Sequence, residues 1–254
     1  MKNFHIYVIS LVEEIDRRRS ISDQLDRMNL DWSFFDAISY KKTDVKICWG
    51  EEALKDAHIR LGRELTVGEI ACSESHFKLY KAISDAPHDI AIVLEDDAII
   101  GSQFIKFIQA LTDLEGFMYD VLILGYSKLS TIKEQRFYKF EPIKSTIDIN
   151  GVKVGPVWRE WTCGTVGYVL SKNAAMKMVA GRRLYTIADD WRSLKVYYRL
   201  VIFHCRPLLI HENFIDFESA IENDRSRLLK PYRAYLDWLR FIRGFIRYSI
   251  MKFC

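Results

Sequence analysis

The stretch DIAIVLEDD, residues 89–97, decides the fold. Its continuous apolar run is typical of a central strand that is buried on both faces of a sheet. The run ends abruptly in three carboxylates, Glu95, Asp96 and Asp97. Ligands of open parallel sheets bind beyond the carboxyl ends of the strands. We therefore expect residues 89–94 to form a core strand and the three acids to lie in a binding site.

Strand and helix patterns alternate on both sides of this stretch. Strand patterns occupy residues 4–11, 34–38, 121–125 and 201–210, and helix patterns occupy residues 15–28, 66–86, 104–114 and 173–181. The second of these helix patterns has an N-terminal signal, because Glu69 follows Thr66 by three residues as in a capping box. Residues 41–62 give no clear prediction, and residues 128–162 resemble a strand-and-loop insertion. The alternation predicts an α/β fold with a mostly parallel sheet covered on both faces.

The composition is that of an ordinary globular protein. The chain has 254 residues, 49% hydrophobic and 28% charged, which excludes collagenous, low-complexity and disordered classes. Five scattered cysteines without a close pair argue against a disulfide framework or a zinc site, so we expect reduced thiols in a cytosolic protein. The N-terminal apolar run resembles a first strand rather than a signal peptide. No uncharged apolar run is long enough to cross a bilayer.

The charge is concentrated at the C-terminal end. The whole chain carries +3, but residues 225–254 carry +7 and the preceding residues carry −4. This distribution argues against nucleic-acid binding by the whole chain. On a helix beginning at Lys230, most of the arginines share one face and the bulky apolar residues lie opposite. Such a helix fits the surface of an anionic membrane, or it packs on the body through its apolar face, and the pattern leaves both open.

The three adjacent carboxylates are fitted to hold a divalent cation. Mg²⁺ and Mn²⁺ prefer carboxylate and water oxygens and complete their shells with substrate phosphates. In an extended segment Glu95 and Asp97 point to one side and Asp96 to the other, so one or two of the three would touch the metal. The structural alternative is an acidic turn after a core strand.

Four other places could carry chemistry. Asp189 and Asp190 could supply a general base or bind a sugar, although an aspartate more often caps a helix. The glycine-rich segment 163–171 permits close backbone approach to a ligand, or marks a bend. Arginines 17–19 could pair with a diphosphate or form a solvated helix face. His211 could complete a manganese shell or lie on the surface.

Taken in order, these segments resemble glycosyltransferase family 25, the group of bacterial lipooligosaccharide galactosyltransferases that is related to collagen galactosyltransferases. The resemblance covers residues 4–227. The matching segments are VISL at 8–11 with the arginines that follow, FDA at 35–37, GEIAC at 68–72 with Ser75 and His76, LEDD at 94–97, GTVGY at 164–168, and Asp189.

The resemblance implies a GT-A type fold with a Rossmann-like nucleotide-binding half and an acceptor half. It also implies a UDP-sugar donor, a Mn²⁺ or Mg²⁺ ion, and inversion at the sugar carbon. On this interpretation Asp97 is the safest metal ligand and Glu95 or Asp96 contacts the ion or the ribose. The residues that would face the rest of the donor are Ser10, Leu11, Arg17, Arg18, Gly164 and Thr165.

The resemblance also suggests the remaining roles. Asp189 is the first candidate for the base and Asp190 the second, and His211, from its position after the last strand pattern, is the candidate for a third metal ligand. Relatives often carry glutamine near His211 or Glu212, which leaves that ligand open. Residues 1–227 would form the transferase domain, and residues 228–254 a basic amphipathic tail.

The resulting hypothesis is a glycosyltransferase that moves a hexose, with galactose the first choice, to a lipooligosaccharide or lipopolysaccharide core. Its lipid-linked acceptor and basic tail would place it in the cytoplasm, peripherally on the inner membrane. The alternatives are a metal-dependent phosphohydrolase and a sugar- or nucleotide-binding protein without turnover.

Overall fold

The computed structural model describes residues 3–127, 129, 134–135, 137–138, 141–144, 146–160, 164–213 and 235–253. The strands are β1 (Phe4–Ser10), β2 (Trp32–Asp36), β3 (Ile90–Glu95), β4 (Ala98–Ile100), β5 (Val121–Tyr126), β6 (Ile147–Ile149), β7 (Val152–Gly155), β8 (Thr165–Ser171), β9 (Ile202–Arg206) and β10 (Ile210–Glu212). The helices are α1 (Ile15–Arg27), α2 (Val45–Leu61), α3 (Val67–Asp85), α4 (Phe104–Asp113), α6 (Lys172–Val179), α7 (Trp191–Tyr198) and α9 (Tyr235–Phe253).

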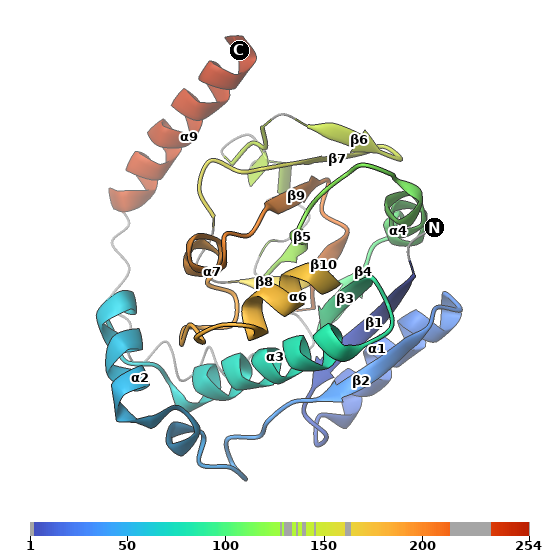
Figure 1. Ribbon diagram of the computed structural model, residues 1–254. Coiled ribbons are helices and arrows are strands. Elements are labelled where there is room, and N and C mark those ends of the chain that lie inside the picture. Colours follow the sequence, from blue (N-terminus) through green and yellow to red (C-terminus); the bar gives the residue numbers. More distant parts are fainter. Residues whose placement is uncertain are drawn as a thin grey trace.

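The described strands form one mixed sheet, in the order β2-β1-β3-β8-β5-β9-β7-β6. A βαβ arrangement opens the chain, because β1 pairs in parallel with β2 on one side and β3 on the other. Strand β8 is antiparallel to both of its neighbours, β3 and β5. The short strand β10 pairs with β4 and β5. The expected α/β fold, a sheet flanked by helices, is confirmed (Figure 1).

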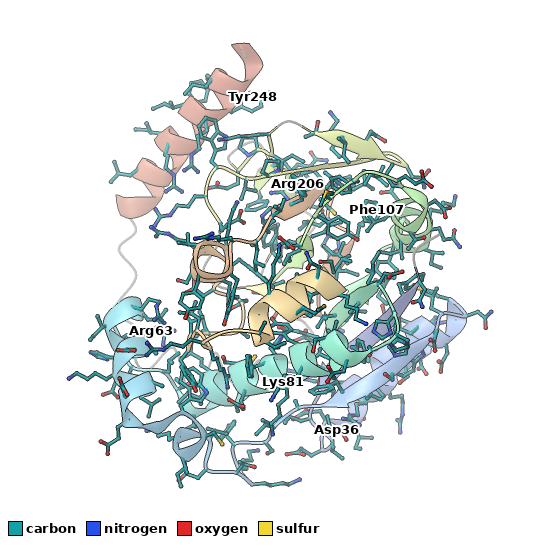
Figure 2. All side chains as sticks on the ribbon, viewed as in Figure 1. Asp36, Arg63, Lys81, Phe107, Arg206 and Tyr248 are labelled. Carbon is teal, nitrogen blue, oxygen red and sulfur yellow. The ribbon has the colours of Figure 1, made fainter. Side chains whose placement is uncertain are left out.

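Two apolar layers cover the faces of the sheet. Strand β3 contributes to both, because alternate residues of a strand point to opposite faces. Ile90, Ile92 and Leu94 pack with α1 and α4, whereas Ala91 and Val93 pack with α3, α6 and α7. The apolar run at residues 89–94 is therefore the central strand that its sequence predicts. Figure 2 shows the side chains, with Phe107 of α4 fully buried in the first layer.

Helix α3 begins as its sequence predicts. The Thr66 side chain accepts a hydrogen bond of 3.1 Å from the Glu69 backbone N–H, and the Glu69 carboxylate accepts one of 3.0 Å from the Thr66 N–H. This capping box satisfies two donors that a helix leaves open at its N-terminus. The carboxylate of Glu69 also pairs with Arg63 at 2.6 Å.

Helix α2 occupies the stretch whose sequence pattern predicts no clear element. Its residues Val45, Trp49, Ala53 and Ala57 are buried against α3 and form a third apolar cluster with Ile70 and Ala71. The helix bends at Gly50, whose φ of 76° and ψ of 164° are not helical. Because of this break, the sequence pattern does not predict one regular helix here.

The C-terminal helix α9 stands at the edge of the body (Figure 1). Arg243 and Arg247 form ion pairs of 3.2 and 2.9 Å with Glu141. Among the side chains of this helix that the structure describes, the exposed apolar ones include Leu239, Ile242, Phe245, Ile246 and Ile250. In the part of the chain that the structure describes, no helix is both long and apolar enough to cross a membrane. The expected domain boundary at residues 227–228 lies outside the described residues.

Candidate functional site

The site forms where β1 and β3 end side by side. The parallel register places Ile9 beside Glu95, so that Ser10 and the two following acids meet at the carboxyl edge of the sheet. Ser10 donates a hydrogen bond of 2.7 Å from Oγ to Oδ2 of Asp96. Asp96 and Asp97 are both buried. The predicted neighbours thus lie together because adjacent parallel strands carry their carboxyl ends to one edge.

Arg17 of α1 is the cation in contact with these acids. Its Nη1 atom donates hydrogen bonds of 3.1 Å to Oδ1 of Asp96 and 3.1 Å to Oδ2 of Asp97. The side chain of Arg17 is 15% exposed, so these pairs are shielded from water. Helix α1 begins shortly after β1, which brings an arginine of its first turn back over the strand end.

Arg18 holds the backbone at the end of β1. It donates hydrogen bonds from Nε to the carbonyl oxygen of Leu11 at 3.1 Å and from Nη2 to that of Ser10 at 3.0 Å. It also forms an ion pair with Asp36 at the end of β2, which is labelled in Figure 2, and lies 4.4 Å from the ring centroid of Phe34. Arg17 therefore contacts the carboxylates of Asp96 and Asp97, whereas Arg18 contacts the backbone at the end of β1.

The acids outnumber the positive charge that they contact. Burial and then the charge of Asp96 raise the pKa of Asp97 to about 6. Burial, followed by the charges of Asp97 and Asp189, raises the pKa of Glu95 well above its usual range. The charge of Glu212 acts in the same direction on both groups. The site therefore favours an added cation, because each of these carboxylates is easier to ionise beside a positive charge.

A divalent cation fits this chemistry. The Oδ1 atom of Asp97 is buried and has no hydrogen-bond partner among the described residues. A buried carboxylate oxygen without a partner is costly unless a ligand satisfies it. Oxygen ligands of this kind are those that Mg²⁺ and Mn²⁺ prefer. Within the described ranges, however, no three His, Cys, Asp or Glu side chains already converge as a complete metal site.

Asp189 joins the site from the segment between α6 and α7. Its Oδ2 atom accepts hydrogen bonds from the backbone N–H groups of Gly164 and Thr165, the latter at 3.2 Å. Gly164 has a φ of 88°, and a Cβ atom there would lie 2.8 Å from Oγ of Ser127. The glycine is required both by its backbone conformation and by the close approach. The predicted group of Gly164, Thr165 and Asp189 is thus brought together.

Asp190 has a different environment from its neighbour. It is 1% exposed, and its Oδ1 atom accepts a hydrogen bond from the Ser193 N–H at 3.2 Å as the N-cap of α7. Its Oδ2 atom accepts one from the Thr186 hydroxyl at 2.9 Å. Both oxygens are therefore engaged inside the protein. This geometry favours the helix-capping role over the role of a second base.

The described contact of His211 is with a carboxylate outside the three acids, and its expected role as a metal ligand stays a prediction. Strand β10 pairs antiparallel with β4, so His211 lies opposite the exposed Ile99 and Glu212 lies opposite the buried Ala98. Directly opposed residues share one face of a sheet. The ring of His211 instead contacts Glu134, with Nε2 and Oε2 3.3 Å apart. Glu212 is the side chain of β10 whose charge acts on Glu95 and Asp97.

His76 lies inside the protein, where it has a structural role. It is 5% exposed, and its Nδ1 atom lies 2.8 Å from the hydroxyl of Tyr168. Tyr168 in turn donates a hydrogen bond of 3.1 Å to the hydroxyl of Tyr80. Burial lowers the pKa of His76 to about 4, so the ring is neutral at physiological pH.

The profile of "Glycosyltransferase family 25 (LPS biosynthesis protein)" matches residues 3–191. The chain belongs to glycosyltransferase family 25. The matched region contains the β1 end, the three acids, the Gly164 turn and Asp189, which is the arrangement described above. The similarity of the segments to this family, noted from the sequence, is confirmed.

Several curated members of family 25 and its relatives are similar to this chain. The lipooligosaccharide biosynthesis protein lic2B of Haemophilus influenzae is 28% identical over 176 residues, 68% of this chain and 62% of that protein. Procollagen galactosyltransferase 1-B of Xenopus laevis is 26% identical over 185 residues, 68% of this chain and 28% of that protein. A putative glycosyltransferase of H. influenzae is 25% identical over 241 residues, 88% of this chain and 77% of that protein. The chain thus spans under two thirds of the length of the first two relatives.

Proposed function

We propose that this family 25 chain transfers a hexose, with galactose the first choice, from a UDP-sugar to a lipooligosaccharide or lipopolysaccharide core acceptor. The observation that carries the proposal is the buried Asp97 carboxylate, whose Oδ1 atom has no hydrogen-bond partner among the described residues, at the carboxyl edge of the sheet. A metal-bound nucleotide diphosphate suits such a place. The names of the Haemophilus and Xenopus relatives support the acceptor class and the sugar.

Asp97 and Glu95 are the residues that would hold Mn²⁺ or Mg²⁺, with Glu212 in place of His211 as the third candidate. A bound ion of this kind supplies charge neutralisation for a departing diphosphate. Arg17 contributes a second positive charge at the same point, because its guanidinium already lies on Asp96 and Asp97. A guanidinium also matches the geometry of a diphosphate.

The loop after β1 would hold the nucleotide. Arg18 fixes the carbonyl groups of Ser10 and Leu11, and thereby the direction in which the following loop leaves the sheet. Ser10 orients Asp96 through its hydroxyl group. The side chains of this loop therefore offer a preorganised surface rather than one that must be assembled on binding.

Asp189 is the residue proposed to remove the proton from the acceptor hydroxyl as that oxygen attacks the sugar carbon. Two backbone N–H groups fix its Oδ2 atom. Its charge also acts on Glu95, which supports a location close to the acids. One displacement from the face opposite the leaving diphosphate inverts the sugar carbon and needs no enzyme nucleophile.

UDP release from a panel of UDP-sugars tests this proposal. The purified full chain is assayed with Mn²⁺, Mg²⁺ or EDTA, with and without oligosaccharide acceptors. Metal-dependent release from one donor, with the sugar recovered on the acceptor, supports the transferase. Release of phosphate from monoesters without sugar transfer would support a phosphohydrolase, and UDP binding without turnover a binding protein.

The C-terminal helix is proposed to hold the enzyme on the cytoplasmic face of the inner membrane, where a lipid-linked acceptor would lie. Arg243 and Arg247 turn toward Glu141 of the body. The helix also exposes an apolar row that includes Phe245 at 60% and Ile246 at 52%. The net charge of +7 in residues 225–254 favours an anionic bilayer as the partner of this row.

Vesicle sedimentation tests the membrane proposal. The full chain should bind vesicles that contain anionic lipid more strongly than neutral vesicles. The pair Phe245→Asp and Ile246→Asp should remove most of that binding. Val196→Asp is the matched control, because Val196 is also an exposed apolar residue, at 77%, but lies on α7. Equal binding by all three proteins would refute the proposal.

A further inference from the structure

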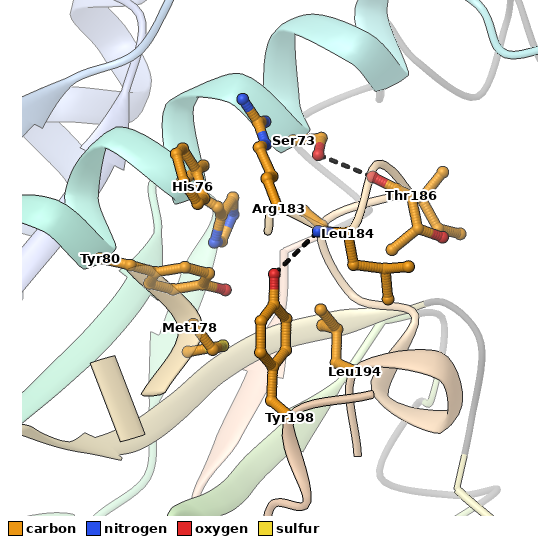
Figure 3. Close-up of a pocket in the computed structure, with 12 residues that line it drawn as sticks. Ser73, His76, Tyr80, Met178, Arg183, Leu184, Thr186, Leu194 and Tyr198 are labelled. Carbon is orange, nitrogen blue, oxygen red and sulfur yellow. Dashed lines mark hydrogen bonds between the residues drawn. The ribbon is translucent and has the colours of Figure 1, made fainter. Parts of the chain in front are cut away.

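The segment that carries Asp189 has little regular structure of its own. Between α6 and α7, its backbone is held by side chains from other elements. Tyr198 accepts a hydrogen bond of 2.9 Å from the Leu184 N–H, Arg60 donates one of 2.6 Å to the Tyr185 carbonyl, and Ser73 donates one of 2.7 Å to the Thr186 carbonyl. Figure 3 shows the first and third of these bonds on either side of the segment. Helices α2, α3 and α7 therefore fix its course.

Arg183 adds a buried charge to these tethers. Its Nη1 atom forms an ion pair of 2.6 Å with Oε2 of Glu74 on α3, and both side chains are nearly buried, 12% and 11% exposed. The same Glu74 oxygen accepts a hydrogen bond of 3.1 Å from Nε1 of Trp49 on α2. The guanidinium carbon lies 4.0 Å from the ring centroid of Phe77 and 4.9 Å from that of Tyr185. One side chain thus links the segment to both helices.

Apolar packing alone does not fix the segment. A small cavity of about 20 Å³, room for a single water molecule, lies between it and α3. His76 and Tyr80 of α3 line this cavity (Figure 3). Ile187 and Ala188 of the segment also line it. Ala188 is the residue directly before Asp189. Because the contact is incomplete here, the polar tethers have a larger share in setting the position of the segment.

Stability alone is a poor reason for this buried ion pair. Replacing such a pair by apolar side chains is often neutral or stabilising, because both charges lose their hydration. In addition, the Nη2 atom of Arg183 is buried without a hydrogen-bond partner among the described residues. The arrangement is therefore better explained by the geometry that it imposes than by the energy that it contributes.

We propose that Arg183 is a positioning residue, which acts through residues 184–188 to hold the Asp189 carboxylate against the N–H groups of Gly164 and Thr165. The expected effect of Arg183 on sugar transfer rests on the proposed function. The positioning itself is a property of the fold. Helix α2, through Trp49 and Arg60, then helps to place a residue of the active site from outside it.

Hydrogen exchange tests the positioning without any substrate. In Arg183→Met the amides of Gly164 and Thr165 should exchange about tenfold faster than in the unsubstituted full chain, because Asp189 no longer holds them as often. Arg183→Lys keeps the charge but loses the planar fork, so it should give an intermediate rate. Arg182→Met is the matched control, since the Arg182 side chain is 77% exposed. It should leave both amides unchanged.

Kinetics tests the consequence for transfer. Arg183→Met should lower kcat about tenfold and change the KM for the donor by a smaller factor, because Asp189 is proposed to act on the acceptor hydroxyl rather than to bind the donor. In the Asp189→Asn background the same substitution should have little further effect, since its target is already lost. Arg182→Met should match the unsubstituted enzyme.

The outcomes separate the two proposals. If the unsubstituted chain transfers no sugar, the proposed function fails, and the exchange of Gly164 and Thr165 still decides the positioning. If Arg183→Met folds and these amides exchange at the original rate, the positioning is refuted. The positioning is also refuted if the variant with both Arg183→Met and Asp189→Asn loses kcat by the product of the two single losses. Should Arg183→Met fail to fold, Arg183→Lys provides the same comparisons.

Discussion

Arg17 donates a hydrogen bond of 3.1 Å from Nη1 to Oδ2 of Asp97, while Oδ1 of the same carboxylate is buried without a hydrogen-bond partner among the described residues. The two oxygens of one side chain thus have opposite surroundings. One is neutralised by the protein, and the other is suited to an added cation.

Asp97→Asn should separate stability from activity. The amide keeps the shape but loses the charge, so we expect metal-dependent UDP release to fall about 100-fold or more. The melting temperature should stay equal or rise, because the variant relieves repulsion from Asp96. Calorimetric Mn²⁺ binding should be lost in parallel. Asp113→Asn, at the exposed end of α4, is the control. Unchanged Mn²⁺ binding in Asp97→Asn would exclude Asp97 as a ligand.

Arg17→Met should make the fold depend on metal. The substitution leaves Asp96 and Asp97 without their shared cation, which should lower the free energy of unfolding by about 2 kcal/mol at neutral pH. Mn²⁺ at 100 times its Kd should raise the free energy of unfolding of the variant by about 2.7 kcal/mol. Arg19→Met is the control on the same helix, because Arg19 is exposed. A melting temperature of Arg17→Met that does not respond to Mn²⁺ contradicts this account.

Gly164→Ala should be more harmful than two other glycine substitutions. A residue with a side chain at a φ of 88° costs about 1–2 kcal/mol, and the new Cβ atom would also press on Ser127. Gly151→Ala shares the positive φ of 82° but has open space, so it measures the backbone cost alone. Gly181→Ala should have neither the backbone cost nor a steric contact, because Gly181 has no positive φ and has open space around it. Chemical unfolding should rank the three variants in this order, with activity lost in Gly164→Ala only.

His76 should make the protein less stable in mild acid. Burial lowers its pKa from 6.5 to about 4 in the folded state, so the unfolded state binds more protons below pH 6.5. Stability is therefore lost as the pH falls from 6.5 toward 4. Between pH 7 and pH 5 the loss from this one group is about 2 kcal/mol. His76→Gln, which cannot be protonated, should show a correspondingly shallower decline. Parallel stability curves for the two proteins would show that His76 does not titrate in this way.

Local signals account for what the sequence could predict. The apolar run of β3 and the Thr66–Glu69 capping box each lie within a few residues, and both form as expected. Helix α2 was missed although Val45, Trp49, Ala53 and Ala57 recur every four residues. Two of these are alanines, and Gly50 interrupts the backbone, so the apolar signal is weak.

The parts of the site that the sequence could not place depend on distant pairing. His211 and Glu212 are adjacent, and only the antiparallel register of β10 on β4 decides which of them faces the acids. A shift of one residue would reverse the result. The contact of Arg17 with the acids likewise follows from the way α1 returns over β1, which no local pattern specifies.

The pairing of β4 with β10 has a consequence for how the protein is made. The backbone N–H of Asn213 donates a hydrogen bond of 2.8 Å to the carbonyl of Asp97, so the acid-bearing turn is closed by residues more than a hundred positions later. During synthesis, Glu95–Asp97 leave the ribosome long before β10 exists. Contacts of such long sequence separation form slowly. The nascent chain therefore completes its acidic centre only after residues 210–213 have been made, when most of the sheet is already available to support it.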